Sequence, residues 1–342
     1  MKNFDLQLFA NTVQTTDLDG LTAEMKTFYD MTLIDEASAN LVHDQFGQKR
    51  PIPKNGGKTI EFRKFAPLAK ATTALTEGVT PDGKSLSVST ITATVSQYGD
   101  YITQSDVLEL TALDNTILEA TKLLGRQAGA TLDTVVRNVL IAGTNVSYCP
   151  KNASGTLTEV TKRSDMDTTS TLTVDMVQRV VAKLRGQNAP TINGKYVAII
   201  HPYVAYDLMR DPEWIDAHKY ANPTNLYEGE IGEIAGVRFV QTTEAKVWND
   251  NTCPAIASTS PAQYHSVFAT LFIGDGAYGV TEITGGGLQT IVKQKGSAGT
   301  ADPLDQRSSV GWKAIKTAEL LIPNYLVRVE SCSPKFDATA AN

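Results

Sequence analysis

The sequence predicts an α+β protein with one long helix, a long extended hairpin and no recognisable catalytic motif. Three observations predict this class. Apolar residues recur at steps of three and four between residues 117 and 139, strand-like runs lie on both sides of that stretch, and helices and strands do not alternate regularly. The 342 residues are 42% hydrophobic and 20% charged, ordinary values that allow one large or two modest folded domains.

Charge and cysteine content exclude several classes of protein. The formal net charge is −6, so no overall positive charge draws the chain onto nucleic acid. Cys149, Cys253 and Cys332 are far apart and form no CxxC pair, so we expect neither disulfides nor a zinc site. This cysteine content favours a reducing compartment. The N-terminus lacks the pattern of a secretion signal, and no run approaches the roughly 18 apolar residues of a membrane span.

The N-terminal quarter is predicted to form an arm, a helix and two strands. Residues 1–20 lack periodicity, 21–41 have helical spacing, and two prolines then enforce extended chain at 51–53. Alternation predicts a strand at 58–63. A second strand-like run at 86–98 changes parity, because its apolar residues are first even-numbered and then odd-numbered. That change requires a bulge or a different buried face.

Residues 65–84, between these strands, form an unusually long connection for a compact domain. One interpretation is a surface loop, and the other is an arm that packs on another subunit. The second assigns intersubunit contacts to the apolar residues spaced along it: Phe65, Leu68, Leu75 and Val79.

The clearest helix is predicted over residues 116–142. Thr116 and Glu119 fit a capping box, and Gly143 is suited to end the helix. At 1.5 Å per residue it would be roughly 40 Å long. We assign its core contacts to four residues of the apolar stripe: Leu124, Leu132, Val135 and Val139.

The remainder is predicted as shorter elements. Residues 144–170 are read as loops and the chain from 333 as a small polar tail. Helices are expected at 175–185 and 204–210, and strands at 196–200, 237–240, 267–273, 288–292, 311–315 and 326–329.

No motif supports catalysis or cofactor binding. Gly57-Lys58-Thr59 ends like a phosphate loop but leads into a predicted strand, whereas the phosphate requires a helix N-terminus. The glycines of 274–279 have dinucleotide-loop spacing but are also followed by a strand-like run. The four histidines show no metal-binding spacing, and no nucleophile elbow is present. We therefore predict no catalytic, cofactor-binding or metal-binding residue, and no enzyme.

Ordered sequence blocks resemble the major capsid proteins of tailed bacteriophages with the Hong Kong 97-type fold, in the branch found in podovirus-like phages. DQFGQKRPIPKNGGKTIEFRK at 44–64, LTEGVTPDG at 75–83 and QYGDY at 97–101 resemble the entry, tip and return of that family's extended loop. The other blocks are LLGRQAGATLDTVVRNVLIAGTNV at 123–146, similar to the spine helix, GEIGEIAGVRFV at 229–240, and DPLDQRSSVGWK at 302–313.

The resemblance implies a domain plan and a function. The plan is an N-terminal arm and helix (1–50), an extended loop (51–100), a peripheral domain with the spine helix (101–145 and 273–332) and an axial domain (146–272). It implies hexamers and pentamers of an icosahedral shell around double-stranded DNA, in the virion and, during assembly, in the host cytoplasm. A separate scaffolding protein and a portal are the other expected partners, with no membrane. The alternative is another phage structural protein, such as a decoration or tail component.

Overall fold

The computed structural model describes residues 31–37, 41–65, 68–75, 77–80, 82–111, 116–153, 155–221, 232–256, 263–297 and 302–342. Helices and strands are mixed without regular alternation, which confirms the α+β class. The chain divides into two compact units. Unit 1 comprises Met1–Ser38, Tyr98–Ala128 and Leu288–Ala314, and unit 2 comprises Ala39–Gln97, Gly129–Gly287 and Ile315–Asn342. Among the described residues, no helix is long and apolar enough to cross a bilayer.

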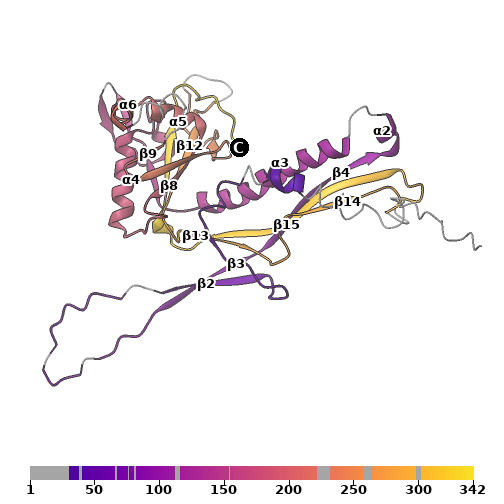
Figure 1. The fold of residues 1–342 in the computed structure, drawn as a ribbon. Helices are drawn as coiled ribbons and strands as arrows, with labels where there is room; N and C mark the ends of the chain where they lie inside the picture. Colours follow the sequence, from indigo (N-terminus) through magenta and orange to yellow (C-terminus); the bar gives the residue numbers. More distant parts are fainter. Residues whose placement is uncertain are drawn as a thin grey trace, which may run out of the picture. The chain divides into compact units, whose positions relative to one another are not determined.

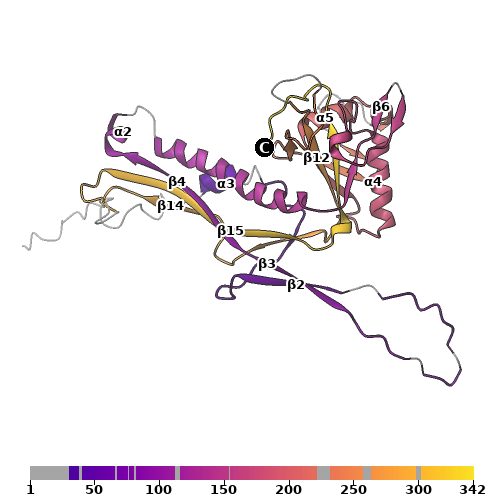
Figure 2. The same ribbon diagram turned by 180° about the vertical axis from the view of Figure 1, so that it is seen from behind.

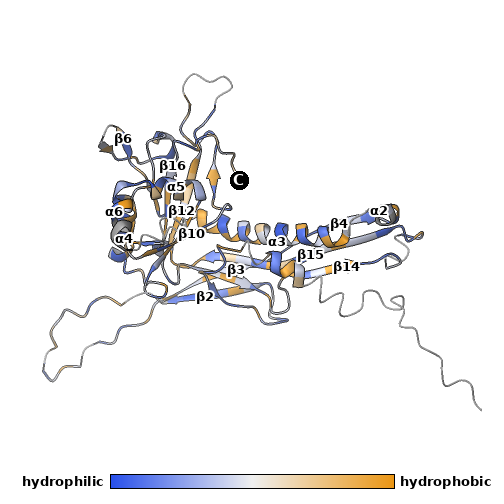
Figure 3. Ribbon diagram, turned by 45° about the horizontal axis from the view of Figure 1, so that its top comes forward, coloured by the Kyte–Doolittle hydropathy of each residue, from blue (hydrophilic) through white to orange (hydrophobic). Residues whose placement is uncertain are grey.

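Unit 2 is built on a seven-stranded sheet of order β5-β16-β12-β8-β10-β9, with β11 paired to β12. Its strands are β5 (Val146–Tyr148), β8 (Tyr196–Ile200), β9 (Glu233–Ile234), β10 (Val237–Gln241), β11 (Val247–Trp248), β12 (Val267–Ile273) and β16 (Leu326–Cys332). Every residue of β8 and β12 is buried, which explains their nearly continuous apolar sequences. Strand β12 is mostly orange, and thus hydrophobic, in Figure 3. The strands predicted at 196–200, 237–240, 267–273 and 326–329 are confirmed.

Three helices accompany this sheet, as Figures 1 and 2 show. They are α4 (Val174–Gly186), α5 (Pro202–Met209) and α6 (Pro212–Ala221). The Thr173 side chain caps α4 by accepting a bond from the Met176 amide, and His201 caps α5 in the same way. Helix α6 was not predicted, because it lacks a strong apolar stripe and is anchored by the fully buried Trp214.

The long helix is α3 (Thr116–Ile141), in agreement with the predicted 116–142. Its buried apolar residues are Ala120, Leu124, Ala128, Leu132, Val136 and Leu140. The stripe advances four residues at each step, so it turns by about 40° per step around the helix. The structure therefore buries Leu124 and Leu132 but leaves Val135 and Val139 half-buried, beside Val136 and Leu140.

The predicted strands around the long connection are β2 (Thr59–Phe65), β3 (Val88–Thr94) and β4 (Ser96–Ser105). β2 and β3 pair antiparallel over seven residues each, from Thr59 opposite Thr94 to Phe65 opposite Val88. β3 pairs with β2 residue by residue and holds no bulge, so the parity change reflects a change of buried face. The odd-numbered apolar residues face inward, whereas Leu86 and Val88 are exposed.

The remaining strands pair within each unit. In unit 1, β14 (Gln289–Lys293) pairs with the first half of β15 (Arg307–Leu320). In unit 2, β13 (Tyr278–Glu282) pairs with the second half of β15 and with β1 (Gln48–Lys49). β15 is much longer than the strand predicted at 311–315, because polar residues such as Ser308 and Lys316 occupy buried positions beyond that stretch.

Three predictions for local structure need correction or lie outside the described residues. The segment 144–170 is not all loop, since it holds β5, β6 (Lys151–Ala153), β7 (Thr156–Thr158) and the 3-10 turn η2 (Arg163–Asp165). Two further short elements were not predicted, α2 (Asp106–Thr111) and the 3-10 turn η4 (Pro323–Tyr325). Of the helix predicted over 21–41, residues 31–37 are helical; the arm at 1–20 lies outside the described residues.

The segment after Ser333 is anchored and not a free polar tail. Phe336 stacks on Tyr203 with ring centroids 4.0 Å apart, and the Ser266 hydroxyl donates to the carbonyl of Asp337 at 2.8 Å. A single aromatic residue among small ones gave too weak a signal for this contact to be predicted.

All three cysteines are free and buried in unit 2. Burial raises the pKa of the Cys149 and Cys253 thiols, and it raises that of Cys332 to about 12. These thiols are therefore protonated at neutral pH and shielded from reagents.

Candidate assembly surface

The β2–β3 hairpin has a firmly packed foot. The Phe62 ring is buried in a small apolar cluster with Ala93 and Leu321, and half-buried Ile60, Ile91 and Ile322 complete it. Phe62 packs so closely on β13 that a Cβ added at Gly279 would lie 2.7 Å from its ring. The hairpin is thus fixed to the body of unit 2 through one face of β2.

Beyond this foot, the described apolar residues of the loop are exposed. Figure 1 shows the chain continuing past β2 and β3 as a long open loop. Three of the residues predicted for intersubunit contact are strongly exposed there, Leu68 at 60%, Leu75 at 77% and Val79 at 63%. The Phe65 side chain lies outside the described residues. A cavity of about 540 Å³ lies between the two limbs of this loop, lined by residues from Leu68 to Lys84.

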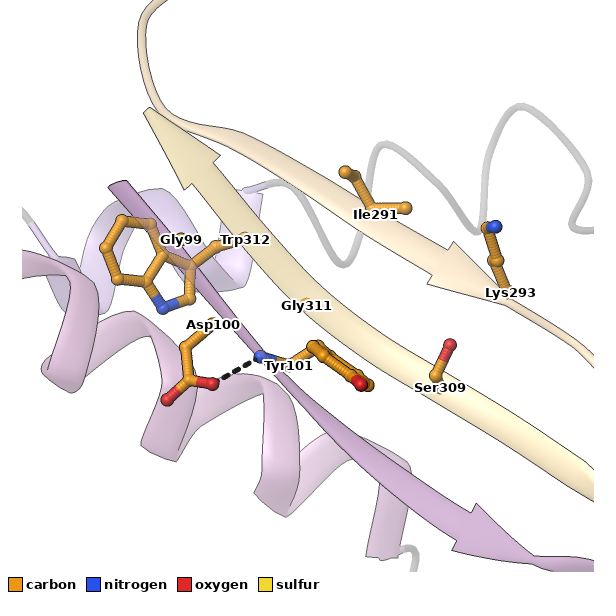
Figure 4. Close-up of a pocket in the computed structure, with 8 residues that line it drawn as sticks. All are labelled: Gly99, Asp100, Tyr101, Ile291, Lys293, Ser309, Gly311 and Trp312. Atoms are coloured by element: carbon orange, nitrogen blue, oxygen red, sulfur yellow. Dashed lines mark hydrogen bonds between the residues drawn. The ribbon is translucent and has the colours of Figure 1, made fainter. Parts of the chain in front are cut away.

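Unit 1 carries a separate groove of about 440 Å³, lined by residues of β4, β14 and β15 (Figure 4). Gly99 and Gly311 allow close strand contact here, because a Cβ on Gly311 would lie 2.7 Å from that of Tyr101. The Trp312 indole donates to the Gln127 amide oxygen at 3.3 Å, and the Gln127 amide donates to Asp100 at 2.6 Å.

Asp100, which lines this groove, is held in its charged form. The bond from Gln127, followed by the bond from the Tyr101 amide, lowers the pKa of the Asp100 carboxyl below its usual value. The groove thus combines a carboxylate and the Lys293 ammonium with the exposed ring of Tyr101. Exposed aromatic and charged side chains of this kind are typical of protein contact surfaces.

A buried ionic cluster lies at the sheet of unit 2. Glu330 is fully buried and accepts two bonds from the Arg163 guanidinium, at 2.6 and 2.8 Å. Arg328 forms a second ion pair with Glu330 at 2.9 Å, and the guanidinium of Arg163 lies over the Trp248 ring at 3.8 Å. Arg328 also donates to the Ile141 and Gly143 carbonyls, which satisfies the C-terminal end of α3.

This cluster was not predicted, because Arg163 and Glu330 are 167 positions apart and neither belongs to a local motif. The exposed Leu86 near the base of the loop was not among the predicted contact residues either. For the fragments that imitate nucleotide sites, the expected context is confirmed, because strand β2 follows Gly57-Lys58 and strand β13 follows the glycines of 274–276. In the described part of the chain, no three His, Cys, Asp or Glu side chains are grouped to hold a metal ion.

Comparisons with known proteins agree with a shell-building fold. The family model described as "Phage capsid protein" matches residues 1–298. The capsid of Cyanophage P-SCSP1u is similar with a TM-score of 0.64 at 14% identity, covering 86% of this chain and 88% of that one. The Cyanophage Pam1 capsid matches with a TM-score of 0.61 at 12% identity, covering 97% and 99%. No curated protein matches the chain.

A third solved structure is the head of Helicobacter pylori bacteriophage KHP40. Its TM-score is 0.59 at 13% identity, and the match covers 83% of this chain and 88% of that one. Together with the hairpin and α3, these matches define the Hong Kong 97-type fold of tailed-phage capsids.

The protein is therefore a structural protein of the bacteriophage virion. The chain belongs to the phage capsid protein family, and it is a major capsid protein whose copies form the icosahedral shell. This assignment favours the shell subunit over a decoration or tail component.

Proposed function

We propose that copies of this chain form the hexamers and pentamers of the shell, that the shell encloses double-stranded DNA without reading its sequence, and that the chain catalyses no reaction. The observation that carries the proposal is the exposure of Leu68, Leu75 and Val79 on a hairpin whose foot is firmly packed. In this assignment the loop 65–84 lies across an adjacent subunit and locks it in place.

The energetics favour a covered loop. Burial of each of these three side chains against a neighbour would contribute on the order of 1–2 kcal/mol, less the entropy of ordering the loop. Because every subunit makes the same contact, weak pairwise energies add up over a closed shell.

We assign the domains according to the plan of the capsid fold. The arm and helix are assigned to 1–50, the extended loop to 51–100, the peripheral domain to 101–145 and 273–332, and the axial domain to 146–272. We assign β16, at the end of the peripheral segment 273–332, to the axial domain instead. The reason is that β16 pairs with β12 and β5 in the seven-stranded sheet.

Assembly requires further partners in this proposal. A separate scaffolding protein guides curvature, and a portal occupies one vertex. Assembly takes place in the host cytoplasm, before the shell becomes part of the virion. The net charge of −6 supports enclosure of DNA without a strong grip on it.

The decisive experiment separates folding from assembly. In one variant, residues 67–82 are replaced by a short Gly/Ser turn. In a milder variant, Leu68, Leu75 and Val79 are changed to Ser. The matched control is Leu157→Ser, an apolar residue 48% exposed on the β6–β7 hairpin. Circular dichroism reports folding, and electron microscopy with scaffold reports shells.

We expect both loop variants to fold with unchanged thermal unfolding but to form few or no shells, while the control assembles normally. Normal shells of normal stability from the loop variants would contradict the proposed contact. Failure to fold would show that the loop belongs to the core of its own subunit.

A further inference from the structure

The foot of the hairpin carries a concentrated positive charge in an acidic protein. Residues 48–64 contain six Lys or Arg and one acid, Glu61, a net charge of +5, which leaves −11 for the remainder of the chain. The six cations are Lys49, Arg50, Lys54, Lys58, Arg63 and Lys64. Such a local excess attracts anionic partners although the whole chain is negative.

These cations are mostly uncompensated. Within the described residues, Lys49 is the only one of the six within 4 Å of a carboxylate, at 3.7 Å from Asp44, which also pairs with Lys316 at 3.0 Å. Arg63 and Lys64 lie opposite Thr90 and Ser89 of β3. Because β3 has the sequence VSTITAT and no charged residue, the partner strand offers them no counter-charge.

An apolar cavity lies directly beside these cations. It has a volume of about 370 Å³, and its lining joins Arg50, Arg63 and Lys64 to apolar residues of the hairpin foot and of the segment after β15: Phe62, Ile91, Leu321 and Ile322. The Arg50 guanidinium is 5.7 Å from the centre of the Phe62 ring. Asp44 and Glu282 line a small neighbouring hollow together with Arg50.

We infer that this surface, defined by Arg50, Phe62, Arg63, Lys64 and Ile91, binds an acidic segment with a bulky apolar side chain, supplied by a second copy of the chain. The apolar floor is what distinguishes a peptide from nucleic acid. A phosphodiester strand would use the cations alone, whereas an acidic peptide also buries an apolar side chain in the cavity. The charge of −11 outside residues 48–64 makes another copy a complementary partner.

The inference rests on the proposed assembly and adds the chemistry of one contact to it. Its test compares Arg63→Gln/Lys64→Gln with a matched control, Lys162→Gln/Arg238→Gln, in which one exposed Arg and one exposed Lys of the same unit are neutralised. Sedimentation velocity measures self-association of the full chain at low and high salt. Fluorescence anisotropy measures binding of a synthetic peptide of alternating Asp and Leu, and of a duplex DNA.

We expect the dissociation constant of self-association to rise roughly tenfold in Arg63→Gln/Lys64→Gln and to lose much of its salt dependence, with no change in the control. The same variant should lose binding of the Asp/Leu peptide. Self-association and peptide binding equal to those of the parent chain would overturn the inference. So would a variant that loses only DNA binding, because the surface would then face nucleic acid.

Failure of this inference is distinguishable from failure of the proposed function. If the parent chain forms no assemblies but binds the peptide through Arg63 and Lys64, the surface has the inferred chemistry and the assembly proposal fails. If shells form and neither measurement responds to the two substitutions, the assembly proposal stands and the inference fails.

Discussion

Individual buried side chains of α3 determine how strongly the helix is held. Leu132 is 4% exposed, and its truncation to Ala leaves a cavity that should lower the free energy of unfolding by roughly 2–5 kcal/mol. Leu123→Ala on the same helix is the control, because Leu123 is 59% exposed and should cost well under about 1 kcal/mol. Chemical denaturation of both variants measures the difference. Equal stability of the two would show that the buried face of α3 is assigned wrongly.

A single histidine gives the chain an acid-sensitive contribution to stability. Burial lowers the pKa of His201 from 6.5 to about 4, and its Nδ1 accepts the Tyr203 amide at 3.2 Å. The lowered pKa means that the unfolded chain binds this proton first as the pH falls. The contribution is therefore fully present above pH 6.5 and is lost towards pH 4, on the order of 2 kcal/mol.

Substitution of His201 tests whether this residue makes the protein less stable as the pH falls. His201→Asn keeps a side-chain acceptor at the start of α5 but does not titrate, so its unfolding free energy should fall less between pH 7 and pH 4 than that of the parent chain. Asp207, on the same helix, works in the opposite direction, because desolvation raises the pKa of its carboxyl. Parallel pH curves for the two proteins would contradict the assignment.

At the scale of elements, contact between β13 and the hairpin foot holds the β2–β3 hairpin in position. Gly279→Ala places a methyl group 2.7 Å from the Phe62 ring, so we expect a loss of about 1–3 kcal/mol and a loosened hairpin. Limited proteolysis within the hairpin should accelerate. Gly287→Ala is the control, since nothing lies within 4 Å of a Cβ there. Equal protease sensitivity of the two variants would show that the hairpin is held elsewhere.

Elements with strong local patterns were predictable, and those specified by distant contacts were not. The step of three and four located α3, and the continuous apolar runs located β8 and β12. The register of the stripe was not predictable at its C-terminal end, because Val135 and Val136 are equally apolar and only the packing partner selects Val136. The anchoring of Phe336 on Tyr203 likewise depends on a contact that spans the sequence.

The assembly surface was predictable only in part. Turn residues and scattered apolar residues marked the loop, and Leu68, Leu75 and Val79 are exposed on it. The basic surface at the hairpin foot was not predicted. Its cations lack counter-charges only because the uncharged strand β3 lies opposite them, and this pairing is not visible in the sequence. The lining of the adjacent cavity also comes from segments that are far apart in the chain.

For the whole molecule, the charge balance predicts weak binding of free DNA. With a net charge of −6 the free subunit releases few counterions on binding, so we expect weak, sequence-independent association with duplex DNA whose affinity depends only slightly on salt. Fluorescence anisotropy with two unrelated duplexes measures it. A nanomolar complex that prefers one duplex at physiological salt would contradict enclosure without recognition.

The three buried thiols allow local unfolding of the chain to be measured by alkylation. Because Cys149, Cys253 and Cys332 are inaccessible and protonated in the folded unit, a maleimide or iodoacetamide reagent reacts with them only when that unit opens. The rate of alkylation in an intact particle thus counts transient openings of its subunits. A shell could be compared before and after genome packaging in this way, with no introduced label and no substitution.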